Sequence, residues 1–266
     1  MFLKLGRTPT LVVSSPKMAR EVMKTHDLKF SNRPQTTARK FLLYGCQDMA
    51  FSQYGEYWRR AKKMCVLELL SAKRVESFQY VRDEEVGLLI DRIRKSCDVV
   101  CGDECVNLKQ MFMSTSNNKI ARCVLGEKFE DENGKSRFGD VSRRILVLLA
   151  AFCVGDFFPA FGWVDVVRGF IRELKTTFRI LDGFFNKVIE EHRTKMNVGK
   201  SDEGKDFVDI MLQLQQDDMF DYLDFSLDRL KAILLLPDGS VLDVEEENGL
   251  TVCKKNPLHL KPVPFM

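Results

Sequence analysis

The stretch YGEYWRRAKKMCVLELLS, residues 54–71, carries the clearest structural signal in the chain. Its apolar side chains recur every three or four residues, which is the period of a helix with one buried face. Basic side chains occupy most of the other face. From about Gln53 we therefore expect a helix that buries one set of side chains and exposes another: Trp58, Cys65, Val66 and Leu69 against Arg59, Arg60, Lys62 and Lys63.

The chain ahead of this helix begins with a pattern typical of a β-hairpin. Two apolar runs, 1–5 and 10–13, flank the turn-forming sequence GRTP. The sequence SSP at 14–16 then supplies a serine N-cap and a proline suited to the first helical position. These residues predict a helix that ends near Thr25.

The pattern after the quoted stretch stays helical for most of the chain. Ser71 can cap a long amphipathic helix, and Asn107 can begin another. Pro159 prevents a continuous helix through 155–162. Further helices are expected at 141–153, 164–195, 207–214 and 227–235.

The helical period is lost from residue 237. Short strands are expected at 250–253 and 258–263, among four prolines. The predicted fold class is therefore mainly α, with small β elements at both ends.

Composition narrows the class of protein. The chain has 266 residues, 45% of them hydrophobic and 30% charged, which is typical of a globular protein. Its 41 basic and 38 acidic residues leave a net charge of +3, which argues against nucleic-acid binding. The longest uninterrupted apolar run, 145–154, is shorter than the roughly 20 residues that span a bilayer. Lys4 and Arg7 interrupt the first apolar stretch, so we expect no secretory leader.

Cysteine spacing gives a weak signal for metal binding. Cys97, Cys101 and Cys105 would share one face of a helix, but Gly102 makes a loop equally compatible with this spacing. Neither arrangement has the paired spacing of a structural zinc site, and no histidine lies nearby. Reduced structural thiols are the favoured interpretation, with a metal site as the alternative.

A series of short segments, in order along the chain, carries a family resemblance. They are LKLG (3–6), VVSSP (12–16), HDLKF (26–30), DMAF (48–51), YGEYWR (54–59), ELLS (68–71), KRV (73–75), GDFFP (155–159), EH (191–192), LPDG (236–239) and GLTV (249–252). Together they resemble the plant A-type cytochromes P-450 of the seventy-one clan, which are haem-thiolate monooxygenases. The resemblance implies a partial cytochrome P-450 fold. It makes 1–235 the N-terminal helical part of the domain and 236–266 its C-terminal β segment.

The same resemblance implies that several family parts are missing. They are the N-terminal anchor, the oxygen-activating helix, the Glu-x-x-Arg helix and the Cys loop that ligates the haem iron. The junction lies between Leu235 and Leu236 and has the form of a deletion, from exon skipping or a faulty gene model. Cys253 does not replace the missing ligand. The family loop reads Phe-x-x-Gly-x-x-x-Cys-x-Gly, and only Gly249 matches, because Glu246 and Lys255 occupy the other two flanking positions. We therefore expect Cys253 to be a strand residue, and we name no catalytic residue and no metal ligand.

Two groups on the quoted helix acquire roles by resemblance. Trp58 and Lys62 occupy positions that reach a haem propionate in the family, although Lys62 replaces an arginine and so lacks its bidentate fork. The alternative is an exposed basic helix with one anchored tryptophan. Arg59, Arg60 and Lys63 could dock the family's electron donor, cytochrome P-450 reductase, and the alternative for them is a solvated face.

The resemblance also assigns segments to a substrate pocket, for which plain core is the alternative. They comprise Asp48, Met49, Ala50, Phe51, Cys153, Val154, Asn248, Gly249, Leu250 and Thr251. The pair Glu191-His192, in contrast, is expected to be solvated and not catalytic, because no nucleophile or second base is placed beside it.

Three hypotheses for function follow. The parent protein would be a haem-dependent monooxygenase that inserts oxygen into a small lipophilic plant metabolite at the cytosolic face of the endoplasmic reticulum. This chain, without the iron ligand, would be inactive, would not retain haem, and would be cytosolic or membrane-peripheral. The alternatives are a non-catalytic remnant that binds a ligand or partner, and a non-functional splice or gene-model product that exposes apolar surface and aggregates.

Overall fold

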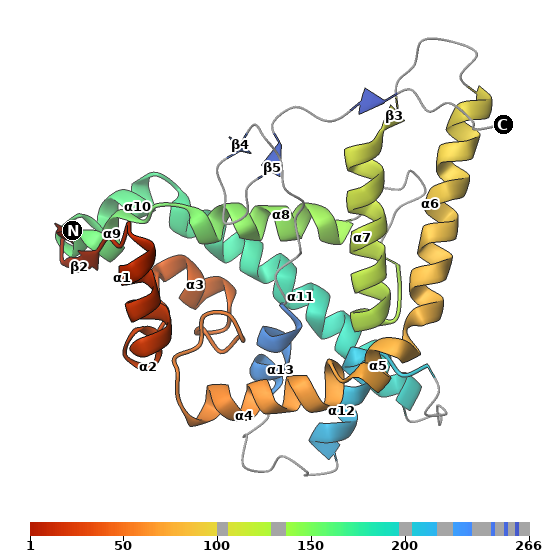
Figure 1. Cartoon of the computed structure of the whole chain (residues 1–266), viewed down its shortest axis with the longest axis horizontal. Helices are drawn as coiled ribbons and strands as arrows, with labels where there is room; N and C mark the ends of the chain where they lie inside the picture. The colour runs from red at the N-terminus through yellow and green to blue at the C-terminus, as the bar shows by residue number, and fades with distance from the viewer. Residues whose placement is uncertain are drawn as a thin grey trace. The chain divides into compact units, whose positions relative to one another are not determined.

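The computed structural model of the chain describes residues 1–99, 106–128, 137–196, 204–216, 226–235, 246–247, 253–254 and 259–260. Helices make up most of these residues, and the strands among them are short (Figure 1). The predicted fold class, mainly α with small β elements, is confirmed. The described residues form two compact units that interleave along the chain. The first draws on 1–64, 148–185 and 220–236, and the second on 65–147, 186–219 and 237–266.

The elements of the first unit are, in chain order, β1 (Phe2–Leu5), β2 (Thr8–Leu11), α1 (Pro16–Arg20), the π-helical η1 (Glu21–Thr25), α2 (Asp27–Phe30), α3 (Thr37–Leu42), α4 (Glu56–Met64), α9 (Val154–Phe157), the 3₁₀ turn η3 (Pro159–Phe161), α10 (Trp163–Val167) and α13 (Leu227–Leu234). Those of the second are the π-helical η2 (Cys65–Leu69), α5 (Ala72–Ser77), α6 (Gln79–Val99), β3 (Val106–Asn107), α7 (Leu108–Leu125), α12 (Phe207–Gln216), β4 (Glu246–Glu247), β5 (Cys253–Lys254) and β6 (His259–Leu260). Two helices, α8 (Arg137–Ala150) and α11 (Phe170–Met196), contribute residues to both units.

The N-terminal hairpin forms, but with a tighter turn than predicted. β1 and β2 are antiparallel, with Phe2 opposite Leu11 and Leu5 opposite Thr8. The second strand begins at Thr8 and not at residue 10, because Gly6 adopts a φ of 59° and the chain reverses within two residues. The Ser15 hydroxyl accepts the N–H of Met18 at 3.3 Å, which confirms the predicted N-cap.

A partly buried polar network ties the core of the first unit to α13. Leu230, Lys231, Ala232, Ile233 and Leu234 of α13 are all buried. The Lys231 ammonium donates to Asp182 Oδ1 at 2.6 Å, and the Tyr44 hydroxyl donates to the same oxygen at 2.9 Å. Burial, followed by the bond to Asp182, raises the pKa of Tyr44.

The basic helix departs from the predicted register near its end. It begins at Glu56 as α4, and the following turn, Cys65–Leu69, is π-helical. A π-helical turn is wider than an α-helical one and rotates later side chains away from the expected face. Val66 is therefore 49% exposed where burial was predicted, whereas Cys65 and Leu69 are buried as expected.

Two predicted long helices are each divided in two. The helix predicted to begin at Ser71 stops at Phe78 and restarts as α6. Ser71 occupies the N-cap position of α5, but its side chain makes no capping hydrogen bond. The helix predicted over 164–195 is broken at Gly169, whose φ of 77° belongs to the left-handed region and ends α10. Pro159 opens the 3₁₀ turn η3, as the predicted interruption of 155–162 requires.

The second unit is built on α6 and α7, which lie side by side (Figure 1). The Asn107 side chain accepts the N–H of Gln110 at 3.1 Å and so starts α7 as predicted. The Glu85 carboxylate, 2% exposed, accepts from Arg122 at 2.8 Å and from Lys128 at 2.7 Å. This ion-pair network joins α6 to the end of α7.

The small strands of the second unit pair in two short ladders. β3 is antiparallel to β6, and β4 is antiparallel to β5, with Glu247 opposite Cys253. Cys253 is therefore a strand residue, as expected. Of the strands predicted at 250–253 and 258–263, the parts beyond Cys253–Lys254 and His259–Leu260 lie outside the described residues.

By length and composition, no single helix among the described residues could cross a membrane. One bent pair, Val141–Phe157 and Pro159–Val167 with 109° between them, meets the same criterion jointly.

Candidate functional site

Helix α4 brings Trp58 and Lys62 together, because residues four apart on an α-helix lie one above the other. The Lys62 ammonium lies 4.8 Å from the centroid of the Trp58 ring, within the range of a cation–π contact. The Trp58 indole N–H donates to the carbonyl oxygen of Met49 at 3.1 Å. The Lys62 charge is therefore the part of this pair that remains available to an anionic group.

Asp48 organises the loop that leads into α4. Its Oδ1 accepts the backbone N–H of Ala50 at 2.7 Å and that of Phe51 at 2.9 Å. Burial raises the pKa of Asp48 even though these donors oppose the shift. Met49, Ala50 and Phe51 are half-buried. These four residues, out of the ten predicted for the substrate pocket, therefore form one tightly turned segment that is mostly shielded from solvent.

Several buried polar atoms near this loop make no hydrogen bond. They are Arg39 Nε, Gln47 Oε1, Asp48 Oδ2 and Ser52 Oγ. Buried polar atoms are normally paired with protein or water, so such a group calls for an explanation. Each of these atoms is almost completely covered by the surrounding protein.

Cys153 and Val154 belong to a second, rigidly capped segment. The Cys153 thiol donates to Asp165 Oδ2 at 3.2 Å, and the Val154 N–H donates to Asp165 Oδ1 at 3.0 Å. Burial opposes ionisation of Asp165, but the N–H donors of Gly155 and Val154 hold the pKa of this carboxyl below its usual value. Asp165 therefore fixes the start of α9 from within α10.

Arg39 lies close to both of these segments of the first unit, the loop at Asp48 and the start of α9. Burial lowers the pKa of Arg39, while attraction to Cys46, Asp48 and Asp156 opposes that shift. Asp156 in turn accepts the N–H of Thr37 at 3.0 Å at the start of α3. Asp48 and Asp156 therefore both lie near the guanidinium group of Arg39. The remaining predicted pocket residues, Asn248, Gly249, Leu250 and Thr251, lie outside the described residues.

The basic cluster of α4 is only partly free to dock a partner. Arg59 and Lys63 are exposed, together with Lys62. Arg60 is half-buried and forms an ion pair with Glu56 one turn earlier. Arg59 and Lys63 are therefore the members of the cluster with the greatest access to solvent.

None of the described thiols fits an iron ligand. Haem-thiolate chemistry needs a deprotonated sulfur sheltered by N–H donors, hence a thiol with a low pKa. Burial raises the pKa of Cys46 to about 11 and that of Cys65 to about 11. Burial also raises the pKa of Cys123 and of Cys153. The side chains of Cys97, Cys101, Cys105 and Cys253 lie outside the described residues.

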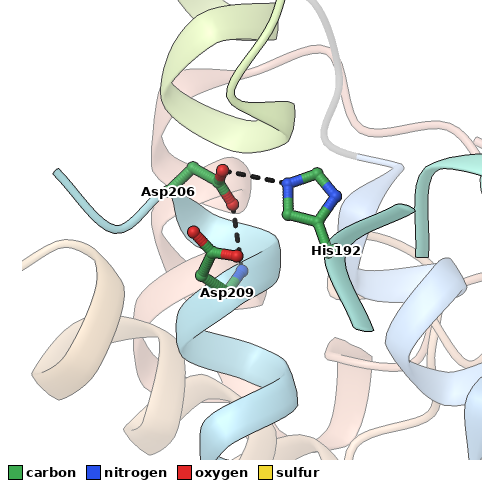
Figure 2. Close-up of side chains that lie close together, drawn as sticks. All are labelled: His192, Asp206 and Asp209. Carbon is green, nitrogen blue, oxygen red and sulfur yellow. Dashed lines mark hydrogen bonds and ion pairs between the residues drawn. The ribbon is translucent and has the colours of Figure 1, made fainter. Parts of the chain in front are cut away.

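His192 is buried, which contradicts the expectation that Glu191-His192 is solvated. The side chain is 3% exposed at the end of α11. Figure 2 shows it facing Asp206, next to Asp209 at the start of α12. Its Nε2 lies 2.9 Å from Asp206 Oδ2, and its Nδ1 lies 2.7 Å from the carbonyl oxygen of Val188. Asp206, 14 residues away, supplies the partner that makes burial possible.

The same three side chains meet the spacing needed to bind a metal ion. Ligand atoms of His192, Asp206 and Asp209 all lie within 4.8 Å of one another. Both ring nitrogens of His192, however, face oxygen acceptors at hydrogen-bond distance. An ion would have to displace the proton on Nε2, so the hydrogen bonding favours an ion pair.

Sequence reasoning placed a helix at 207–214 but did not identify Asp206 as its cap. An aspartate directly before an apolar helical run is a common N-cap signal. Asp206 Oδ1 accepts the N–H of Asp209 at 2.9 Å. That signal could have located Asp206, although not its pairing with His192.

Comparison with known proteins places these features in a family. The family model described as cytochrome P450 matches residues 1–236. Phenylacetaldehyde oxime monooxygenase CYP71AN24 of Prunus mume is 46% identical over 234 residues, which cover 88% of this chain and 44% of that protein. Cytochrome P450 71A1 of Persea americana is 44% identical over 238 residues, covering 88% and 47%. The chain thus spans about half the length of the curated relatives it matches.

Solved structures agree with this assignment at the level of fold. A zebra fish cytochrome P450, in a structure with progesterone, superposes with a TM-score of 0.66 at 21% identity. The superposition covers 88% of this chain and 51% of the zebra fish chain. The family match ends at residue 236, next to the junction that the sequence predicts between Leu235 and Leu236.

Proposed function

The chain belongs to the cytochrome P450 family, and from this premise we propose that it is part of a haem-dependent monooxygenase that acts on a small lipophilic plant metabolite. The observation that supports the parent activity is the match over residues 1–236 to a family that includes named plant monooxygenases. The proposal extends to 236–266 as the C-terminal β segment of the same domain as 1–235.

For this chain by itself, we propose that oxygen insertion does not occur. The described thiols all have raised pKa values, with Cys46, Cys65 and Cys153 buried and Cys123 half-buried, and the flanking residues of Cys253 do not match the family's ligand loop. The decisive experiment is to add haem to the purified chain, reduce it and expose it to carbon monoxide. The proposal expects no thiolate-type Soret shift, and such a shift would overturn it.

The surviving part of the haem site would be the Trp58–Lys62 pair. Stacking on Trp58 holds the Lys62 ammonium, and the Met49 carbonyl fixes the indole ring. In the complete protein this charge would receive a propionate. The lipophilic substrate would lie against the 48–51 and 153–154 segments.

The reductase would dock through exposed Arg59 and Lys63, with Arg60 assisting from its pair with Glu56. Charge at such a surface mainly accelerates encounter, so the association rate should fall steeply with added salt. Binding to reductase that is insensitive to salt, or no binding, would reject this docking surface.

A position at the cytosolic face of the endoplasmic reticulum membrane is part of the same proposal. Large apolar side chains of η3 and α10 are exposed, including Phe161, Trp163, Val166 and Val167. The Arg7 N–H donates to the Phe157 carbonyl at 2.9 Å, which ties the hairpin to this segment. Exposed aromatic and aliphatic side chains flanked by basic ones are typical of surfaces that enter a lipid interface. Flotation with anionic vesicles tests this position, and it would be rejected if replacing both Phe161 and Trp163 with Ser left binding unchanged.

The second candidate is a product without function of its own. Many large apolar side chains of both units are exposed, which favours aggregation over a stable fold. Genomic DNA between the codons for Leu235 and Leu236 separates the cases. An intact exon for the Cys loop there would mark this chain as a splice or annotation product of a working gene.

A further inference from the structure

The environment of His192 Nδ1 fixes one proton on the imidazole ring. Nδ1 lies 2.7 Å from the Val188 carbonyl oxygen one turn earlier on α11. A carbonyl oxygen can only accept a hydrogen bond, so Nδ1 must donate. A neutral ring would then carry a lone pair on Nε2.

The group that faces Nε2 is also an acceptor. Asp206 Oδ2 lies 2.9 Å from Nε2. Asp206 Oδ1 accepts the N–H of Asp209 as the N-cap of α12, and the positive end of a helix favours an ionised carboxylate there. A neutral ring would therefore point the Nε2 lone pair at the Asp206 carboxylate, and the two would repel each other. Only a cation bound at Nε2, either a proton or a metal ion, removes this repulsion.

We propose that His192 is a buried imidazolium that latches the ends of α7, α11 and α12 together, and that loss of its Nε2 proton releases the start of α12. The three elements meet closely at this point in Figure 2. A Cβ on Gly126, the C-cap of α7, would lie 2.3 Å from Asp206 Oδ2. The residue after Gly126, Glu127, accepts from Lys195 of α11 at 2.7 Å, so a second ion pair closes the same junction.

The charges around the ring favour its protonated form. Burial lowers the pKa of His192, but the bond to Asp206, the Val188 carbonyl and the nearby Asp209 together raise it above the ordinary value. Glu127 and Lys195 also face the cluster, and they neutralise each other by pairing.

Deprotonation would act first on α12. It would leave the buried Asp206 carboxylate facing a lone pair, and a buried charge without its partner is strongly destabilising. The first turn of α12, which holds buried Phe207, Val208 and Ile210, then loses its cap. Because the folded pKa is raised, the stabilisation is complete below the unfolded pKa of about 6.5 and is lost as pH rises through the folded pKa.

Hydrogen exchange on the full chain, corrected for the intrinsic pH dependence of exchange, tests the latch. Between pH 6.5 and the folded pKa, amide protection in α12 should fall by up to about tenfold per pH unit. His192→Gln should remove this pH dependence. His26→Gln, at an exposed histidine of the first unit, should keep it. Protection in α12 that does not change with pH in the unaltered chain would overturn the proposal.

Nitrogen chemical shifts of the His192 ring provide a measurement that needs no folded variant. Both nitrogens should be protonated at neutral pH, and a neutral tautomer would overturn the proposal.

Adding Zn²⁺ distinguishes a proton from a metal ion as the group bound at Nε2. If Zn²⁺ added at neutral pH raises α12 protection in the unaltered chain but not in His192→Gln, a metal ion has displaced the Nε2 proton, the site is a metal site and the proton latch is wrong.

Discussion

At the scale of single residues, the charge of Lys62 separates a haem-facing helix from a merely basic one. Lys62 is held on the Trp58 ring. Lys63, one residue later, is also exposed and makes no such contact among the described residues. The chain has two tryptophans, and replacing the exposed Trp163 with Phe leaves Trp58 as the reporter.

Haem added in excess would contact this chain only through its propionates, without an iron ligand and therefore weakly. We predict that Lys62→Ala, in the Trp163→Phe background, weakens the quenching of Trp58 fluorescence by this added haem. Loss of one partly solvated charge contact is worth about 1 kcal/mol, or about fivefold in affinity. Lys63→Ala is the matched control and should leave the quenching midpoint unchanged. Equal weakening by both variants would mean that the helix attracts anions through its general charge alone.

Glu85 is the residue on which acid stability of the second unit depends most clearly. Burial opposes its charge, but Lys128 and Arg122 hold the pKa of this carboxylate below its usual value. Its stabilisation is therefore complete above the unfolded pKa of about 4.3 and is lost as pH falls through the folded pKa.

We predict that Glu85→Gln lowers the free energy of unfolding by about 2 kcal/mol at neutral pH, because two charge-assisted hydrogen bonds lose their anion. The loss should shrink as pH falls below the unfolded pKa and should vanish below the folded pKa, where the unaltered carboxyl is also protonated in the folded chain. Glu84→Gln is the control, since Glu84 is 57% exposed and bonds the same Arg122 at 2.5 Å. It should cost less than about 1 kcal/mol in urea unfolding.

At the scale of elements, the ends of helices could be predicted where the signal is local. The Ser15 and Asn107 caps form as predicted, because each bonds an N–H three residues later. The break at Phe78 has no glycine or proline to mark it, and the apolar period continues across it. The burial of His192 depends on Asp206, a partner beyond a polar segment, and periodicity carries no information on such a pairing.

The site shows the same division between local and distant signals. Helical spacing predicted that Trp58 and Lys62 share a face, and their stacking agrees. The bond from Trp58 to Met49 could not be predicted, since it depends on how the preceding loop turns around Asp48.

Two helix-ending glycines provide a matched prediction at this scale. Gly126 and Gly169 both have left-handed φ values, 72° and 77°. A Cβ at Gly169 would meet nothing within 4 Å among the described atoms, whereas one at Gly126 would strike the Asp206 carboxylate. We predict that Gly169→Ala costs about 1 kcal/mol in unfolding free energy, from backbone strain alone. Gly126→Ala should cost about 3 kcal/mol or more, because it also separates a buried ion pair. Equal losses of unfolding free energy in the two variants would mean that the C-terminal end of α7 is not in close contact with Asp206.

At the scale of the whole molecule, exposed apolar side chains set the expected solution behaviour. In the second unit, Leu67 and Leu70 are 54% and 60% exposed on and just after η2. In the first unit, Val166 and Val167 are 63% and 76% exposed on α10. Exposed apolar side chains of this kind promote association unless another surface covers them.

We predict that the purified chain self-associates, as judged by light scattering. Leu67→Lys with Leu70→Lys, and separately Val166→Lys with Val167→Lys, should each shift the distribution toward monomer. Lipid vesicles distinguish the two surfaces. If α10 contacts lipid, vesicles should suppress association in the Leu67/Leu70 variant, where α10 is intact, more than in the Val166/Val167 variant. A monodisperse monomer of the unaltered chain would contradict the prediction. It would then follow that the exposed apolar side chains do not form a continuous adhesive surface.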